Sequence, residues 1–386
     1  MRSVTWGLAG EPVRLAGALS IQPGLAGQAP SRLSDSSEAQ IADPWIRFTG
    51  RAPSGVRLEV DTDTDVIELE VALTRIKILD STPLPAVFDL SVGESEVLSY
   101  STEDTALLHV TDLQSVTIEV HEHAPTTVRF DGLGAHSKRL VLWLPPSCGV
   151  EIVDVRVDDS ALATRPTETR PRWIHYGSSI SHCAEARQPT EAWPAAVARR
   201  RGLDLVNLGM AGQAQLDQFA ARDIRTADPD LISIKVGINI LNADSMRERA
   251  FITALHGFLD TIRDAQPKTP LLVITPIICP VSEDHPGPTV IVDGKASVVE
   301  RPASLNDGAL TLRRIRELIT DVVTARIALG DGNLSLISGL NLFGEGDLEQ
   351  MPDGLHPSPD GWLLMADRFD AHVFDADGVW ASAPDA

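Results

Sequence analysis

Cysteine is scarce in this sequence, which holds Cys148, Cys183 and Cys279 and no others. An odd, widely spaced set does not make a disulfide framework, and no spacing among the three suits a zinc site. We therefore expect buried free thiols and a reducing compartment.

Long apolar runs are also missing. Residues 1–6 lack a charged segment that leads into a continuous apolar stretch, and the apolar-leaning residues 15–25 are interrupted by Gln22, Pro23 and Gly24. Neither a signal peptide nor a transmembrane helix is expected, so the sequence predicts a cytoplasmic protein.

Positive charge is in short supply. Lys and Arg number 33 against 54 Asp and Glu, which gives a net charge of −21. Such a surface repels phosphate backbones and anionic lipid, so neither a nucleic acid nor a membrane is expected as a partner. The oligomeric state stays open, a homo-oligomer included.

The 386 residues are long for one hydrophobic core, and the pattern of apolar residues changes near residue 165. Between residues 45 and 157 the apolar residues alternate with polar ones, as in segments 56–60, 66–71 and 116–120. This period of two, with turn formers between the runs and no helical stretch, predicts an antiparallel β-sandwich of jelly-roll-like character.

From residue 172 onward, apolar strands alternate with amphipathic helices. The expected strands are 173–176, 205–208, 231–236 and 271–274, and the expected helices are 190–201, 216–225, 246–265 and 310–328. This order predicts a three-layer α/β domain of flavodoxin-like character with a parallel sheet. We expect domains at 1–165 and 166–386, with residues 160–171 as the linker.

Polar or glycine-rich clusters follow the expected strands, where ligands bind in parallel sheets. They are Gly177-Ser178-Ser179-Ile180, Asn207-Leu208-Gly209-Met210-Ala211-Gly212, Gly237-Ile238-Asn239 and, near the C-terminus, Asp353-Gly354-Leu355-His356. Each cluster taken alone also suits a helix cap or a turn. Their joint order favours a catalytic site.

These clusters resemble the sequence blocks of the SGNH (GDSL-like) hydrolases over residues ~172–372. Ser179 matches the nucleophile of the Gly-Asp-Ser block, with Ser178 in place of its Asp. Asn239 matches the Asn of the third block, which has Ile240 where the family has Asp, and Asp353 and His356 match the fifth block.

The resemblance also implies an oxyanion hole. It would consist of the N–H groups of Ser179 and Gly212 and the side-chain amide of Asn239, with Gly209 as the fallback for Gly212. A Ser hydroxyl needs a base to remove its proton and a carboxylate to orient that base. The resemblance therefore implies a catalytic triad of Ser179, His356 and Asp353. The rival α/β-hydrolase fold requires Gly-x-Ser-x-Gly, and position 181 is Ser.

A subset of these hydrolases that carries an N-terminal β-sandwich is more similar still. Its nucleophile block resembles Tyr176-Gly177-Ser178-Ser179-Ile180, its first helix carries a pair like Trp193-Pro194, and its sandwich has a segment like residues 86–90. Relatives of this layout deacetylate carbohydrates. The resemblance thus implies an esterase that removes small acyl groups, O-acetyl groups on a sugar first among them, without a cofactor or a metal.

Two alternatives remain open: an esterase or thioesterase for lipid-like or aryl acyl groups, and a catalytically silent glycan-binding protein. No substrate-binding residue is identified. The long segment 279–300 after the fourth strand is expected to form a lid or wall of the acyl pocket.

Other polar motifs have simpler explanations. Residues 61–65 resemble the start of a calcium loop, but Val66 and Ala72 replace its Gly and Glu, so a hairpin turn is expected. The segment His121-Glu122-His123 suits a metal or an exposed strand face equally well. His175 is expected in the core, and His182 is a weak candidate for the pocket wall.

Overall fold

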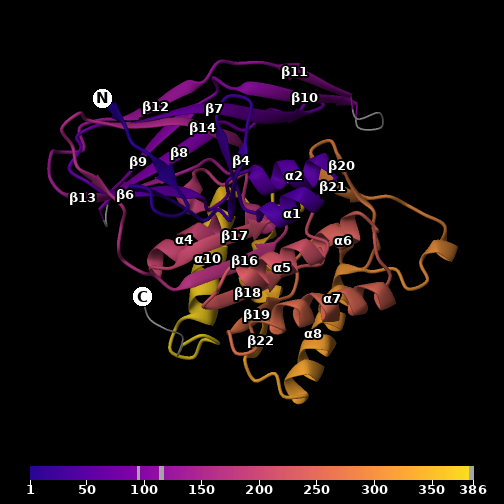
Figure 1. Cartoon of the computed structure of the whole chain (residues 1–386). Coiled ribbons are helices and arrows are strands. Elements are labelled where there is room, and N and C mark those ends of the chain that lie inside the picture. The colour runs from indigo at the N-terminus through magenta and orange to yellow at the C-terminus, as the bar shows by residue number, and fades with distance from the viewer. Residues whose placement is uncertain (94–95, 113–116, 382–386) are drawn as a thin grey trace. The chain divides into compact units, whose positions relative to one another are not determined.

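The computed structural model describes residues 1–93, 96–112 and 117–381 (Figure 1). Contacts between residues divide the chain into two compact units. Unit 1 contains Met1–Thr169 and Cys183–Ala195, and unit 2 contains Arg170–His182 and Ala196–Ala386.

Unit 1 is built from two sheets whose strands are mainly antiparallel. The first sheet has the strand order β11-β10-β7-β14-β5-β4, with β1 beside β14 and β12 beside β7. Its strands are β1 (Arg2–Ser3), β4 (Ser20–Pro23), β5 (Gln28–Ser31), β7 (Ile67–Ile78), β10 (Ala106–Asp112), β11 (Thr117–His121), β12 (Thr126–Phe130) and β14 (Cys148–Val157).

The second sheet of unit 1 has the strand order β2-β3-β6-β13-β8-β9, with β15 beside β6. Its strands are β2 (Trp6–Gly7), β3 (Val13–Ala16), β6 (Arg57–Thr62), β8 (Ala86–Val92), β9 (Glu96–Thr102), β13 (Lys138–Trp143) and β15 (Ala163–Thr164).

One hydrophobic core lies between these two sheets. It joins residues of the first sheet such as Leu69 and Val71 to residues of the second such as Leu58, Phe88 and Leu140, all fully or nearly fully buried. Strand β7 alternates buried and half-buried side chains from Ile67 to Ile76, as the period of two predicts. The structure thus confirms the predicted β-sandwich.

No helix was expected between residues 45 and 157, and this is wrong for the beginning of that segment. Unit 1 contains α1 (Asp35–Gln40) and α2 (Pro44–Arg51). The carboxylate of Asp43 accepts hydrogen bonds from the N–H groups of Trp45 and Ile46 at 2.7 and 3.2 Å, and Pro44 occupies the first turn. This N-cap, followed by a proline, starts a helix at the beginning of the segment in which no helix was expected.

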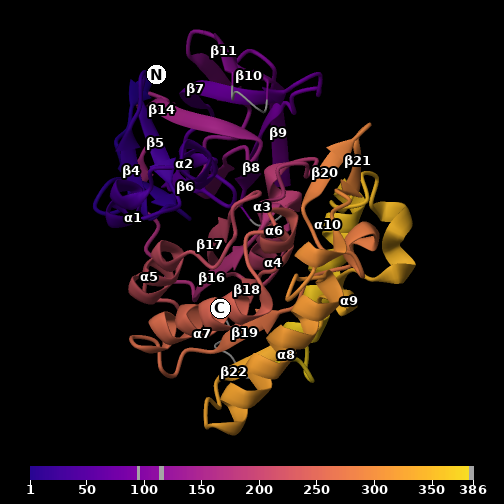
Figure 2. The same cartoon turned by 90° about the vertical axis from the view of Figure 1, so that its right-hand side faces the viewer.

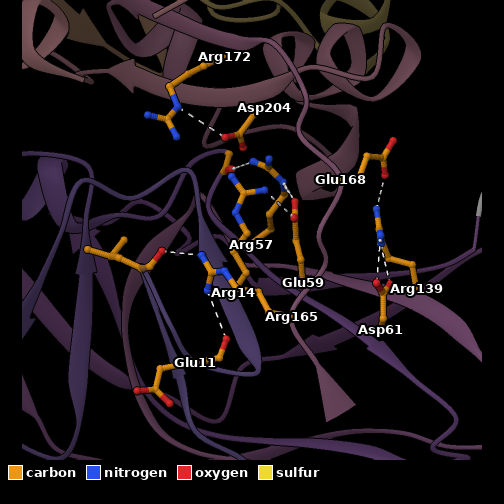
Figure 3. Close-up of polar contacts among 12 residues, drawn as sticks. Glu11, Arg14, Arg57, Glu59, Asp61, Arg139, Arg165, Glu168, Arg172 and Asp204 are labelled. Atoms are coloured by element: carbon orange, nitrogen blue, oxygen red, sulfur yellow. Dashed lines mark hydrogen bonds and ion pairs between the residues drawn. The ribbon is translucent and has the colours of Figure 1, made fainter. Parts of the chain in front are cut away.

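The expected linker is partly bound to unit 1 (Figure 3). The Arg165 guanidinium donates to the carbonyl oxygens of Gly7, Leu8 and Glu11, and Glu168 accepts from Arg139. These contacts explain why unit 1 continues to Thr169, four residues past the boundary expected from the sequence.

Unit 2 contains a parallel sheet of five strands in the order β17-β16-β18-β19-β22 (Figure 1). The strands are β16 (Arg172–Gly177), β17 (Asp204–Gly209), β18 (Leu231–Lys235), β19 (Leu271–Ile274) and β22 (Leu334–Ile337). Numbered along unit 2 this order is 2-1-3-4-5, the flavodoxin-like arrangement. The residues of β17, β18 and β19 are all buried, as expected of a sheet covered on both faces.

Helices cover both faces of this sheet. Trp173 and Tyr176, which project from opposite faces of β16, stack on different helices: Trp173 on Phe369 of α10 at 5.4 Å between ring centroids, and Tyr176 on Phe258 of α7 at 5.0 Å. The sequence-based prediction of a three-layer α/β domain is therefore confirmed. Its helices are α3 (Ser179–His182), α4 (Trp193–Arg200, which begins in unit 1), α5 (Gln218–Thr226), α6 (Ile238–Asn242), α7 (Glu248–Arg263), α8 (Leu312–Ala328), α9 (Gly339–Leu342) and α10 (Pro359–Val373).

Short 3-10 turns and one hairpin complete the chain. The turns are Pro189–Glu191, Pro280–Ser282, Ala303–Leu305 and Glu345–Gln350, and the hairpin consists of β20 (Thr289–Val292) and β21 (Lys295–Val298). All three cysteines are free and buried, as expected. Within the described ranges, no helix has the length and apolar character that crossing a membrane requires.

Candidate active site

The carboxyl ends of three neighbouring strands place the candidate residues at one edge of the unit 2 sheet. In the register of the sheet, Gly177 of β16 lies beside Gly209 of β17 and beside Lys235 of β18. Ser179 follows Gly177 by two residues, Gly212 follows Gly209 by three, and Asn239 follows Lys235 by four.

Ser179 is the first residue of the short helix α3, which follows β16 after a tight turn. A side chain at Gly177 would place its Cβ 2.1 Å from Ser181 Oγ, so only glycine fits there. Ser178 caps the helix: its Oγ accepts from the N–H of Ile180 at 3.3 Å, and its carbonyl accepts from the N–H groups of Ser181 and His182. The capping role considered for this serine pair therefore falls to Ser178, and the hydroxyl of Ser179 is directed elsewhere.

The structure brings Ser179, His356 and Asp353 into one hydrogen-bonded chain. Ser179 Oγ lies 2.8 Å from His356 Nε2, and His356 Nδ1 lies 2.7 Å from Asp353 Oδ2. The side chains of His356 and Asp353 are 20% and 28% exposed, so the chain is sheltered but open to a ligand. This is the geometry in which a base removes a proton from a serine hydroxyl.

Asp353 is held as a carboxylate. Its second oxygen, Oδ1, accepts from the backbone N–H groups of Leu355 and His356 at 2.8 and 2.7 Å. Partial burial raises the pKa of Asp353, but the hydrogen bonds from the His356 ring and from both N–H groups together outweigh burial and leave the pKa below its ordinary value. A negative charge thus faces the Nδ1 side of His356 at neutral pH.

Asn239 lies near the start of α6 and is 4% exposed. Its Oδ1 accepts from the N–H of Ala214 at 3.0 Å, which fixes the amide orientation and leaves Nδ2 as a donor. Gly237, which precedes the helix, has a φ of 126°, and a Cβ there would meet Ile315 at 2.6 Å. Glycine is therefore required at the turn that delivers Asn239.

Their hydrogen bonds show which of Gly212 and Gly209 is the better candidate for the oxyanion hole. The N–H of Gly209 donates to Asn207 Oδ1 at 3.0 Å, and its carbonyl accepts from His182 Nδ1 at 3.0 Å. Gly212 has a φ of 72° and open space around it. Because the Gly209 N–H already has an acceptor, Gly212 is the better candidate for an oxyanion donor.

Two other histidines, His175 and His182, are buried and hydrogen-bonded within the domain. His182 is 3% exposed and bonds the β17 backbone, so it does not line a pocket wall. His175 is fully buried, with Nδ1 2.6 Å from Ser233 Oγ and Nε2 2.7 Å from Ser181 Oγ. Burial, aided by the charge of Lys235, lowers the pKa of His175 to about 3, so the ring is neutral at physiological pH.

Segment 279–300 is structured and touches the turn that carries Asp353 and His356. It contains the β20–β21 hairpin (Figure 2), whose Ala296 N–H donates to the Asp353 carbonyl at 2.7 Å. Cys279 Sγ also lies 3.5 Å from the Gly354 carbonyl. The sequence contains the hairpin signal, Asp293-Gly294 between two β-type runs, which the expectation of a loop overlooked.

Comparisons with known proteins identify the family of the α/β part of the chain. A family model described as the GDSL-like lipase/acylhydrolase family matches residues 171–373. No curated protein matches the chain.

Similar solved structures span both units. The salicylyl-acyltransferase SsfX3 from a tetracycline biosynthetic pathway has a TM-score of 0.77 and 26% identity, with 92% of each chain covered. A Bacteroides ovatus protein assigned to the GDSL-like lipases has a TM-score of 0.66 and 18% identity, with 93% of this chain and 94% of that chain covered. A family two carbohydrate esterase from Clostridium thermocellum has a TM-score of 0.60 and 14% identity, with 94% and 98% covered.

The family model covers more than half of the 386 residues and includes every residue of the hydrogen-bonded chain above. The protein therefore belongs to the GDSL-like lipase/acylhydrolase family.

Proposed function

We propose that this acylhydrolase cleaves esters of short acyl groups through an acyl-serine intermediate on Ser179. The observation that carries the proposal is the continuous chain from Ser179 Oγ through the His356 ring to Asp353, with links of 2.8 and 2.7 Å. A catalytically silent glycan-binding protein would have no need of this alignment.

Each of the three hydrogen-bonded residues has one role in the first half-reaction. His356 Nε2 takes the Ser179 proton as Oγ attacks the carbonyl carbon, and the carbonyl electron pair moves onto the oxygen. Asp353 holds the His356 Nδ1–H and stabilises the imidazolium that forms. A base in this position contributes about 10²–10⁴ in rate.

The oxyanion is stabilised by three donors in this proposal: the N–H groups of Ser179 and Gly212 and Nδ2 of Asn239. Collapse of the tetrahedral intermediate breaks the ester C–O bond, and the alcohol leaves with the proton from His356. Water then loses a proton to His356 and attacks the acyl-serine, which releases the acid and restores Ser179.

A short acyl group is favoured by the packing next to the nucleophile. Ile180, Ile238, Ile277 and Cys279 belong to a group of mainly apolar residues that encloses no space for even a water molecule. This group therefore offers no internal space to a long acyl chain. For the alcohol part of the ester we propose a sugar, so that the substrate is an O-acetylated sugar. The carbohydrate esterase from Clostridium thermocellum, which shares the two-unit layout over 94% of this chain, supports this choice.

An aryl acyl group is the second candidate. A salicylyl-acyltransferase is among the similar structures, at 26% identity over 92% of both chains. The β20–β21 hairpin also presents Val290, Ile291 and Val292 to solvent with 41%, 56% and 52% exposure. Apolar side chains beside the turn of Asp353 suit an aromatic ring better than a sugar.

The test is hydrolysis of p-nitrophenyl esters of increasing acyl length, with acetylated xylo-oligosaccharides and phenyl salicylate as alternative substrates. We expect acetyl esters to be preferred, and turnover to fall by about 10⁴ or more in Ser179→Ala. Preference for salicylate would select the aryl alternative, and a preference for long chains would contradict the short-acyl proposal. Activity that survives the substitution would exclude Ser179 as the nucleophile.

A further inference from the structure

Two histidines and one glutamate converge on the edge of the first sheet of unit 1, and the proposed mechanism uses none of them. His109 of β10 lies directly opposite Glu119 of β11 in the antiparallel register, and His121 lies two residues farther along β11. Side chains two residues apart share a face of a strand, so all three project from the same side of the β10–β11 pair. Their possible ligand atoms lie within 4.8 Å of one another.

The His109 ring is already oriented for binding. Its Nε2 lies 2.8 Å from the carbonyl oxygen of Leu79, and since a carbonyl only accepts, Nε2 carries the hydrogen. In the neutral imidazole Nδ1 then carries the lone pair, and it lies 3.9 Å from Glu119 Oε2. Metal-binding histidines typically donate their other ring N–H to a carbonyl or carboxylate in this way.

His121 completes the set from the neighbouring position. Its Nε2 lies 3.9 Å from the same Glu119 oxygen. Ligand atoms bound to tetrahedral zinc at about 2.0–2.1 Å are separated by roughly 3.4 Å, so small side-chain rotations would bring the three atoms to zinc distances. The side chains of Glu119 and His121 are 60% and 58% exposed and free to make this adjustment.

We propose that His109, Glu119 and His121 bind a divalent transition-metal cation of the zinc type. Two imidazole nitrogens and one carboxylate oxygen make a donor set that suits Zn²⁺, with a fourth position open to water. Alkaline-earth ions prefer oxygen ligands, so Ca²⁺ and Mg²⁺ are disfavoured.

The cation would stabilise the edge strand β11 by linking it to β10. Strand β11 is at the end of its sheet and pairs with β10, and all five of its side chains are exposed. Because no buried side chain anchors β11, its hydrogen bonds to β10 are its main restraint. A metal held by one residue of β10 and two of β11 would cross-link the pair.

The sequence alone did not reveal this set. The segment His121-Glu122-His123 suggested a metal through its spacing, but His123 Nδ1 lies 2.7 Å from the Ala124 carbonyl, outside the cluster. The third ligand comes from His109, which only the strand register brings to Glu119.

The test uses the tag-free full-length protein, stripped with a chelator and titrated with ZnCl₂ in a calorimeter. We expect one Zn²⁺ per chain in the wild type and in the matched control His123→Ala. We expect His121→Ala, Glu119→Gln and His109→Ala to weaken binding by at least about 10-fold. His121 is exposed, so its substitution keeps the test valid even where His109→Ala fails to fold.

Hydrogen exchange of the β11 amides supplies the second readout. Zn²⁺ should slow exchange across Thr117–His121 in the wild type and leave it unchanged in His121→Ala. Absence of Zn²⁺ uptake by the wild type would overturn the proposal, and so would uptake that is unaffected by both His121→Ala and Glu119→Gln. Esterase activity is not part of this test, so its result is independent of the function proposed above.

Discussion

At the scale of single residues, the adjacent serines Ser178 and Ser179 at the start of α3 make separate contacts. Ser178 Oγ bonds the N–H of Ile180 and caps α3, whereas Ser179 Oγ faces His356. Asp, which the family block has at the first of these positions, is an equally good N-cap. The departure from the family block therefore preserves the local helix start.

Ser178→Ala should thus separate folding from catalysis. We expect a loss of about 1 kcal/mol in the free energy of unfolding, because one cap is removed. Turnover of p-nitrophenyl acetate should stay within a few-fold of wild type. Denaturant unfolding and steady-state kinetics on the same sample check both halves, and a loss of turnover as deep as that of Ser179→Ala would contradict the assignment.

Asn239→Ala tests the proposed oxyanion donor. Removal of one such donor costs about 10²–10³ in turnover, and the substrate KM should change little because the donor acts on the transition state. The kinetics of acetyl ester hydrolysis provide the measurement. A kcat close to wild type would exclude Asn239 Nδ2 from the oxyanion hole.

The buried ring of His175 predicts how stability depends on pH. Its pKa is about 3 in the folded chain, against about 6.5 in an unfolded chain. Below pH 6.5 the unfolded state takes up a proton that the folded state refuses, so the stability present above pH 6.5 falls as pH drops toward 3. The full effect is on the order of 5 kcal/mol.

His175→Gln keeps a donor near Ser181 but cannot take up a proton. We expect the free energy of unfolding of this variant to fall less than that of the wild type between pH 6.5 and pH 4. Urea titrations at several pH values provide the comparison. Parallel pH profiles for the two proteins would show that His175 is not buried and neutral.

At the scale of elements, the β20–β21 hairpin is the part of the candidate site with the clearest influence on specificity. Ala296, which pairs with Ile291 in the hairpin, donates its N–H to the Asp353 turn, and strand β20 exposes Val290, Ile291 and Val292. The hairpin therefore combines a fixed position with an apolar surface.

Replacement of Val290, Ile291 and Val292 by serine should lower kcat/KM several-fold for esters of aryl acids such as phenyl salicylate and leave p-nitrophenyl acetate little changed. Burial of apolar surface at about 25 cal/mol per Å² gives the reason, because the substituted strand offers less apolar surface to a ring. Leu329→Ser, at an 89% exposed position after α8, is the matched control. Equal kinetics for the variant and the wild type across all esters would remove the hairpin from the substrate site.

Elements with strong periodicity were predictable from the sequence. The strand expected at 271–274 is Leu271–Ile274 in the structure, and the helix expected at 310–328 is Leu312–Ala328. Strand β22 was missed because Leu334-Ser335-Leu336-Ile337 is only four residues long and contains a polar residue, although Gly330-Asp331-Gly332-Asn333 marks the break after helix α8. Helix α2 was missed because its signal lies in Asp43 and Pro44, which cap it, and not in a long apolar period.

The site residues that stand directly after predicted strands could be identified from the sequence. The sequence blocks identified Ser179, Asn239, Asp353 and His356. In the structure Ser179 and Asn239 follow neighbouring strands at one edge of the sheet, and Ser179, His356 and Asp353 are joined by hydrogen bonds. Contacts made across the sequence were not predictable. The Ala296–Asp353 hydrogen bond and the pairing of His109 with Glu119 depend on tertiary packing and strand register, which no local pattern encodes.

At the scale of the whole molecule, the two units are interleaved in sequence. Segment Cys183–Ala195 follows helix α3 but belongs to unit 1. There the fully buried Asp89 accepts from Thr190 N–H and Oγ1 at 3.0 and 2.5 Å, and from Ser99 Oγ at 2.6 Å. A cut between the units therefore leaves this segment without its partners.

A fragment of residues 166–386 should accordingly fail as an independent esterase. Without Asp89 the polar groups of Thr190 lose their buried acceptor, a penalty of about 1–3 kcal/mol each, and apolar surface is exposed as well. Solubility, far-UV circular dichroism and acetyl ester turnover of the fragment test this. A soluble fragment with full-length turnover would contradict it.

The central claim, that Ser179 is the nucleophile, is tested most directly by covalent labelling with a fluorophosphonate and peptide mapping by mass spectrometry. The account predicts one label per chain, located on Ser179, retained in Ser178→Ala and lost in both Ser179→Ala and His356→Ala. A label on another residue, or labelling that persists in Ser179→Ala, would contradict it.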